Sequence, residues 1–393
     1  MSSDISIGAE LSVPRATLSA LSASLIGIGL ARFAYTPLIP ALIAEHWFTP
    51  SATAYLGAAN LAGYLAGALL ARPLAARHSP VAALRSTMAL AALAFFACAV
   101  PLSFLWYFAW RFAAGFAGGV LMVLAAPTVL PHVAPKRRGL VGGAIFTGVG
   151  LGIALSGTLV PLLLRLGLAA TWCGLGALAA ALTALAWTGW PHQAALGRRS
   201  TVALPRNPLL TALYAEYALA AVGLVPHMVF LVDFVARGLG EGVATGSRYW
   251  VVFGLGALAG PTLAGHVADR IGFSRGLRLG FALQAACVAL VTVTSGPAAL
   301  LVSSAVIGGF VPGIVALVLG RAHELVGGDA AAQQRAWRFA TIAFAIGQAV
   351  AAYGFSYLYA GGSSYALLFA LGAGALVLAL VLDFAAPAFA RRR

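Results

Sequence analysis

Four ionisable side chains lie inside long apolar stretches of this sequence: Arg32, Arg111, Glu216 and His227. A guanidinium is a planar fork of hydrogen-bond donors that suits a carboxylate or another anion. An imidazole and a buried carboxyl group can both take up and release protons near neutral pH. These four residue types therefore favour anion binding and proton exchange.

Patterns typical of other chemistries are missing from the sequence. His323-Glu324 is not followed by the second histidine of a zinc hydrolase, and no phosphate-binding loop of the form G-x-x-x-x-G-K-[ST] occurs. Cys98, Cys173 and Cys287 lie in apolar runs without paired spacing, which argues against a disulfide framework or a thiolate metal site. We therefore expect no enzymatic activity, no cofactor and no metal.

The composition explains what must surround these side chains. Of the 393 residues, 61% are hydrophobic and 9% are charged, whereas soluble domains carry about 25% charged residues. The sequence thus indicates a protein that crosses a membrane several times. Its formal net charge of +14 is scattered over short loops, so we expect a lipid bilayer and not nucleic acid as its partner.

Twelve apolar segments are each long enough to cross a hydrocarbon core, which needs about 20 helical residues. Helix is the expected state because a membrane span must satisfy its own backbone hydrogen bonds. The sequence therefore predicts an all-α polytopic protein, with spans near 16–44, 51–76, 82–101, 103–131, 139–164, 169–190, 208–236, 245–269, 276–295, 297–320, 334–360 and 364–386.

The placement of Lys and Arg predicts the orientation of the chain. Alternate loops, beginning with the one near Arg77, hold most of the basic residues, whereas the other loops hold only Arg165, Arg237 and Arg248. The positive-inside rule then places both termini in the cytoplasm. The expected regions are an N-terminal tail (1–15), a six-helix bundle (16–190), a central loop (191–207), a second six-helix bundle (208–386) and a basic tail (387–393). The acidic N-terminus lacks the features of a cleaved signal peptide.

An internal repeat supports this division into two bundles. Gly63 and Gly67 of the second span align with Gly256 and Gly260 of the eighth, and the same ungapped register pairs Arg77 with Arg270. Two six-helix halves with repeated architecture are typical of transporters of the rocking type.

The loop after the eighth span has the sequence GHVADRIGFSRGL at 265–277. It resembles the loop signature of the major facilitator superfamily, and the whole chain is similar to that superfamily. The first span (GLARFAYTPLIP, 29–40) and the fifth (FTGVGLGIALSG, 146–157) resemble its YbfB/YjiJ-type branch. The resemblance implies a monomeric secondary transporter with twelve spans and a central site that opens alternately to each side.

The same resemblance suggests a conformational latch. Asp269, with Arg270 beside it and Gly265 and Gly272 around it, is expected to meet the beginning of the fifth span, which Arg137 and Arg138 precede. A carboxylate there would face a helix N-terminus and basic side chains. The alternative is a solvated acid in a turn. The matching loop of the first half has Ala76 and Ser79 in place of Asp and Gly, which puts a symmetric second latch in doubt.

Arg32 is the first candidate for substrate binding, because an arginine inside a membrane span is costly unless it faces a cavity or a partner. Tyr35 is on the same helix face, three residues on. Arg111 begins a segment similar to the fourth-span motif R-x-x-Q-G of the superfamily, with Ala114 in place of the amide. The alternative for Arg32 is a purely structural pair with another group of the protein. The alternative for the Arg111 segment is helix packing through Gly115.

Glu216 and His227 are candidates for proton coupling, and His227 also for substrate binding. Eleven residues separate them, which places them within about 20° of one helix face and about 16 Å apart along the axis. Aligning Gly29 with Gly223 also places His227 opposite Arg32 across the expected cavity. A histidine satisfied within the core is the alternative.

The expected function is secondary active transport across the bacterial cytoplasmic membrane, coupled to protons, with a small organic anion as substrate. One alternative is export of hydrophobic drug-like compounds by proton antiport. It rests on Gly148-x-Gly150-x-Gly152, which is similar to an exporter motif except that Ile153 stands where the proline would be. A second alternative, from another class, is a transport-like membrane sensor.

Overall fold

The computed structural model describes residues 12–191, 207–327 and 329–390. Within these ranges the chain forms helices and no strand, and twelve helical segments are long and apolar enough to cross a membrane. The all-α fold with twelve spans is therefore confirmed. Most of the predicted tails (1–15 and 387–393) and of the central loop (191–207) lies outside the described residues, although helix already begins at Val13 and continues to Ala390.

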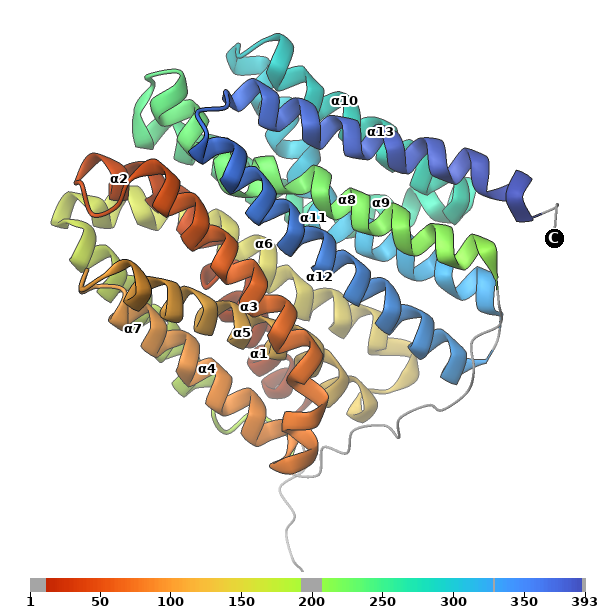
Figure 1. Cartoon of the computed structure of the whole chain (residues 1–393). Coiled ribbons are helices and arrows are strands. Elements are labelled where there is room, and N and C mark those ends of the chain that lie inside the picture. Colours follow the sequence, from red (N-terminus) through yellow and green to blue (C-terminus); the bar gives the residue numbers. More distant parts are fainter. Residues whose placement is uncertain (1–11, 192–206, 328, 391–393) are drawn as a thin grey trace, which may run out of the picture.

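The spans run up and down through the molecule (Figure 1). Several begin at a side-chain N-cap, for example Ser79, whose Oγ accepts from the Ala82 N–H at 3.0 Å, and Asn207, whose Oδ1 accepts from the Leu209 N–H at 2.9 Å. Spans two to twelve are α3 (Pro50–Arg77), α4 (Pro80–Ala97), α5 (Phe104–Val129), α6 (Arg138–Leu163), α7 (Leu168–Ala186), α8 (Pro208–Asp233), α9 (Gly242–Ile271), α10 (Phe273–Val293), α11 (Pro297–Val326), α12 (Ala330–Ala360) and α13 (Tyr365–Ala390).

The first span is not one regular helix. It consists of α1 (Val13–Ser24), a π-helical segment (Leu25–Leu30), a 3-10 segment (Phe33–Leu38) and α2 (Ile39–Ala44). Pro37 and Pro40 each lack a backbone N–H, and such positions, like π-helical turns, interrupt the regular hydrogen-bond ladder. The interruption falls at Ala31 and Arg32, in the middle of the span.

Equivalent glycines in the two halves allow the same close packing of helices. A Cβ added to Gly67 of α3 would lie 2.0 Å from the carbonyl oxygen of Phe116 in α5. A Cβ added to Gly260 of α9 would lie 1.9 Å from the carbonyl oxygen of Gly309 in α11. The N-terminal half (α1 to α7) and the C-terminal half (α8 to α13) thus share one packing scheme, in which small residues let backbones approach.

This packing gives a testable contrast between two glycines of the same helix. Gly260→Ala should lower the melting temperature of the purified protein by several degrees, because the added methyl group overlaps the backbone of α11. Gly265→Ala is the matched control, since a Cβ there meets no heavy atom within 4 Å. Equal melting temperatures for the two variants, measured by thermal unfolding in detergent, would contradict the packing described here.

The two halves contact each other mainly along α6 with α9 and α3 with α12. In the middle of the first interface, the indole N–H of Trp250 donates to Ser156 Oγ at 3.1 Å. Figure 1 shows the halves close together at one end and spread apart at the other, where the chain termini lie. We call the latter the basic end, because Arg77, Arg138 and Arg270 lie in or beside its turns.

Contacts between the halves are present at the end opposite the basic end. The Thr36 hydroxyl donates to the Met228 carbonyl at 2.5 Å, and the rings of Tyr55 and Tyr353 have centroids 6.3 Å apart. Near the basic end, a Cβ added to Gly143 of α6 would meet no heavy atom within 4 Å. The contacts between the halves described here thus lie in the middle of α6 and α9 and at the end opposite the basic end.

Candidate functional site

The irregular first span is held at Ala31 by side chains from two other spans. The Ala31 carbonyl accepts hydrogen bonds from Nη1 of Arg111 at 3.0 Å and from Nδ2 of Asn60 at 3.2 Å. Asn60 Nδ2 also donates to the carbonyl of Arg111 at 3.1 Å. These bonds join the first span, α3 and α5 at the point where the first span changes its helical type.

Arg111 and Tyr35 stack beneath this junction. The guanidinium carbon of Arg111 lies 4.1 Å from the centroid of the Tyr35 ring, and the Tyr35 hydroxyl donates to the Thr53 carbonyl at 2.9 Å. A cation over an aromatic face is attracted by the ring quadrupole. The arrangement fixes the direction in which the Arg111 guanidinium points.

A small pocket lies next to this junction, and we call it the central pocket. Both halves of the molecule contribute to it, and none of its lining residues is acidic. It is lined by Arg32, Phe33, Tyr35, Thr36, Gly57, Asn60, Leu61, Arg111, Met228 and Val229.

Neither arginine of the central pocket has an acidic partner among the residues that the structure describes. The Arg32 guanidinium reaches Sδ of Met228 at 3.9 Å and lies 5.2 Å from the ring centroids of both Phe33 and Tyr64. Arg111 is 2% exposed. Two positive charges thus lie in a largely apolar surrounding, which is unfavourable unless an anion joins them.

His227 does not face Arg32, so that expectation is wrong. Its Nε2 is 2.7 Å from Ser303 Oγ, and its ring packs edge-on against Phe369 at 5.0 Å between centroids. The next residue, Met228, faces Arg32 instead, because successive residues of a helix point about 100° apart. His227 is a core histidine of the C-terminal half and lines neither of the two pockets described here.

Glu216 lines a second pocket, which we call the inner pocket, at the basic end of the C-terminal half. Glu216 is 2% exposed and makes no hydrogen bond or ion pair with the described residues. Glu216 and His227 therefore lie in different surroundings, although their spacing of eleven residues places both near one helix face. The inner pocket is lined by Leu209, Leu213, Glu216, Ser274, Arg278, Arg321, Asp383, Ala386 and Pro387, and Arg278 forms an ion pair with Asp383.

The residues of the predicted latch are apart in this structure. Asp269 and Arg270 are exposed and make no ion pair with the part of the chain that is described. Arg138 donates to the Val133 carbonyl at 3.0 Å, and Arg137 is exposed. Gly272 has a φ of +85°, a conformation that favours glycine. This backbone conformation explains why the loop has a glycine at that position. The latch stays a prediction for a form closed at the basic end.

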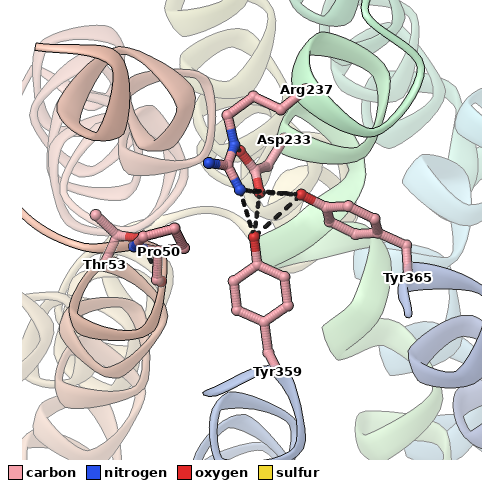
Figure 2. Close-up of polar contacts among 6 residues, drawn as sticks. All are labelled: Pro50, Thr53, Asp233, Arg237, Tyr359 and Tyr365. Carbon is pink, nitrogen blue, oxygen red and sulfur yellow. Dashed lines mark hydrogen bonds and ion pairs between the residues drawn. The ribbon is translucent and has the colours of Figure 1, made fainter. Parts of the chain in front are cut away.

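Asp233 belongs to a cluster of polar side chains within the C-terminal half. Figure 2 shows Asp233, Arg237, Tyr359 and Tyr365 pointing at one another from α8, its extension, α12 and α13. Arg237 Nε lies 2.7 Å from Asp233 Oδ1, and the hydroxyls of Tyr359 and Tyr365 donate to Oδ2 at 2.9 and 2.6 Å. The carboxylate is 1% exposed and fully bonded.

Asp233→Asn should lower the melting temperature by at least about 5 °C, because removing one partner of a buried ion pair costs about 3–5 kcal/mol. Glu324→Gln is the control, because the Glu324 side chain is 41% exposed and ion pairs at exposed positions contribute about 0–1 kcal/mol. Thermal unfolding in detergent measures both variants. A melting temperature for Asp233→Asn equal to that of Glu324→Gln would show that the cluster does not stabilise the fold.

Sequence reasoning missed Asn60, Met228 and Gln348. Asn60 is the only asparagine inside a predicted span, and that rarity was the available signal. Met228 carries no ionisable group, yet its sulfur contacts Arg32 and also accepts from Gln348 Nε2 at 3.7 Å. The alignment that drew attention to His227 was therefore one residue away from the contact.

Comparison with known proteins agrees with this architecture. A family model described as "Uncharacterised MFS-type transporter YbfB" matches residues 24–384. No curated protein matches the chain significantly. The matched range includes all of the central pocket and the inner-pocket residues up to Asp383. The chain belongs to the YbfB family of transporters of the major facilitator superfamily.

Proposed function

We propose that this secondary transporter carries a small organic anion, which binds in the central pocket between Arg32 and Arg111. The single observation that supports the proposal most is that both guanidiniums lie in this pocket without a carboxylate. A bound anion would supply the missing negative charge, and the planar forks suit a carboxylate. Thr36 and Tyr35 supply further polar groups on the same wall.

Proton coupling is the second part of the proposal, with Glu216 as the proton-carrying group. Its support is a buried carboxyl group without a partner in a pocket that also contains Arg278, Arg321 and Asp383. A carboxyl group in such surroundings can change its charge when nearby arginines move. His227 has no part in this proposal, because it packs within the core of the C-terminal half.

The proposed setting is the bacterial cytoplasmic membrane, with the basic end and both termini in the cytoplasm, and the protein acts as a monomer. The excess of basic residues in the turns of that end supports this orientation. We further propose that the structure is the form open to the cytoplasm, and the spread of the two halves at the basic end in Figure 1 supports this. In the form closed there, Asp269 would meet the beginning of α6 near Arg137 and Arg138.

Asp269→Asn should slow transport severalfold. It should leave the melting temperature unchanged, because the Asp269 side chain is exposed and unpaired in this structure. Transport slows because the neutral amide loses the charge interaction with the N-terminus of α6, and this loss destabilises the form closed at the basic end. Uptake into liposomes and thermal unfolding measure the two properties, with Glu241→Gln as a control on an exposed acid. A normal uptake rate for Asp269→Asn would contradict the latch.

Export of hydrophobic compounds has weaker support. A Cβ on Gly148 would lie 2.5 Å from the Leu21 carbonyl, and one on Gly152 2.4 Å from Cα of Gly29. One on Gly150 would lie 2.8 Å from the backbone nitrogen of Leu258. Close packing of α6 against the first span and α9 therefore accounts for these three glycines.

Purified protein in liposomes that contain a pH-sensitive dye distinguishes the two transport hypotheses. Small carboxylates and lipophilic cations are added separately, and empty liposomes give the background. Proton movement that depends on carboxylates supports the proposal. Proton movement that depends only on lipophilic cations would favour the exporter.

A further inference from the structure

The orientation of the Asn60 amide is determined by its neighbours. Its nitrogen lies 3.2 Å from the Ala31 carbonyl oxygen and 3.1 Å from the Arg111 carbonyl oxygen, and both of these groups can only accept. The flipped amide would place its oxygen against two acceptors. Both N–H bonds are therefore used, and Oδ1 is the group that stays available.

Oδ1 of Asn60 has no hydrogen-bond partner, although the residue is 1% exposed and lines the central pocket. Arg32 and Arg111 also line this pocket, and the Nε atom of each is buried without a hydrogen-bond partner. Buried polar atoms are nearly always bonded, and each unpaired atom costs about 1–3 kcal/mol. The pocket thus combines unpaired donors on two cations with one unpaired neutral acceptor.

We infer that the transported anion carries a neutral hydrogen-bond donor beside its acidic group, as a 2-hydroxy carboxylate does. The inference rests on the proposed function and narrows its substrate class. The carboxylate binds the guanidiniums, and the hydroxyl donates to Oδ1 of Asn60. All three unpaired atoms then belong to one binding site.

Two related classes of acid fit this set of groups less well. A plain carboxylate without the hydroxyl would leave Oδ1 of Asn60 unpaired in the complex. A 2-amino acid would bring an ammonium group close to Arg32 and Arg111, where no acidic side chain lines the pocket to balance it. Like charges in such surroundings repel strongly. The site therefore selects for a neutral donor.

The walls of the pocket suit an apolar remainder of limited size. Phe33, Leu61, Met228 and Val229 surround the polar groups. These apolar walls suit an alkyl or aryl substituent on the carbon that bears the hydroxyl.

The test compares ligands and not variants, because replacing Asn60 would also release the Ala31 and Arg111 carbonyls and disturb the fold. The purified full chain in detergent is titrated at pH 7 by isothermal calorimetry with three matched series. These are glycolate, acetate and glycine; L-lactate, propionate and L-alanine; and L-mandelate, phenylacetate and L-phenylglycine.

In the series whose size fits best, the hydroxy acid should bind at least about tenfold more tightly than the plain acid and the amino acid. Equal affinity of the hydroxy acid and the plain acid would overturn the inference and leave the anion site standing. Tightest binding of the amino acid would overturn it as well. Absence of binding by all nine ligands would instead count against the proposed anion site itself.

Discussion

Arg32→Gln is expected to lower the initial rate of carboxylate uptake into liposomes by about 10- to 100-fold. Hydrogen bonds to charged groups contribute about 1.5–3 kcal/mol, and each 1.4 kcal/mol is a factor of ten. The glutamine keeps a polar side chain of moderate length, but it lacks the positive charge and the planar set of N–H donors of the guanidinium. Since Arg32 has no acidic partner in the described part of the protein, the substitution breaks no internal ion pair. The fold should therefore be retained.

Arg32→Lys should lie between wild type and Arg32→Gln, because it keeps the charge and loses the bidentate geometry. Arg165→Gln is the matched control, since Arg165 is exposed in the turn between α6 and α7. Wild-type uptake by Arg32→Gln, with a wild-type melting temperature, would remove Arg32 from the site. A lowered melting temperature in Arg32→Gln alone would instead indicate a structural role.

Glu216→Gln is expected to abolish accumulation of the anion driven by a pH gradient, while exchange of anion across the membrane continues. Glutamine has nearly the same shape as the carboxyl group and cannot take up or release a proton. Because Glu216 makes no hydrogen bond with the described residues, its replacement leaves no partner unpaired. Two assays on the same liposomes, net accumulation and exchange with labelled anion inside, separate coupling from binding.

Glu241→Gln serves as the control for this experiment, because it changes the same residue type at an exposed position just before α9. Loss of both accumulation and exchange in Glu216→Gln would assign the residue to folding or binding. Full accumulation would exclude it as the proton carrier.

One helix connects the two pockets. α8 carries Glu216 in the inner pocket and Met228 and Val229 in the central pocket. The twelve residues from Glu216 to Met228 correspond to about 18 Å along a helix axis. The Thr36 hydrogen bond to the Met228 carbonyl ties the same helix to the N-terminal half. Movement of α8 relative to the first span would thus affect both pockets, which is how we propose that anion and proton binding are linked.

The fold was predictable from the sequence because its determinants are local. Each span needs about 20 apolar residues, and the glycines at 67 and 260 repeat in register. The sequence also predicted that Arg32, Tyr35 and Arg111 take part in one site, and all three line the central pocket. The prediction was possible because charged residues in a membrane span face a polar interior.

The rest of the site depends on contacts between distant segments, which local patterns do not reveal. The π-helical and 3-10 segments of the first span rotate the residues after Leu30 relative to a regular helix, so an alignment of spans one and seven placed His227 wrongly. Asn60 donates to the carbonyls of Ala31 and Arg111, which are 29 and 51 positions away in the sequence. The latch depends on which end of the molecule is open, and one sequence encodes both forms.

The most direct test of the account is accumulation of a labelled small carboxylate by wild-type protein in liposomes, with and without an imposed pH gradient. The account predicts that the gradient drives the anion above its equilibrium concentration, and that collapse of the gradient with a protonophore releases it. Equal anion content with and without the gradient would contradict proton coupling. Anion content no higher than in empty liposomes under either condition would contradict anion transport.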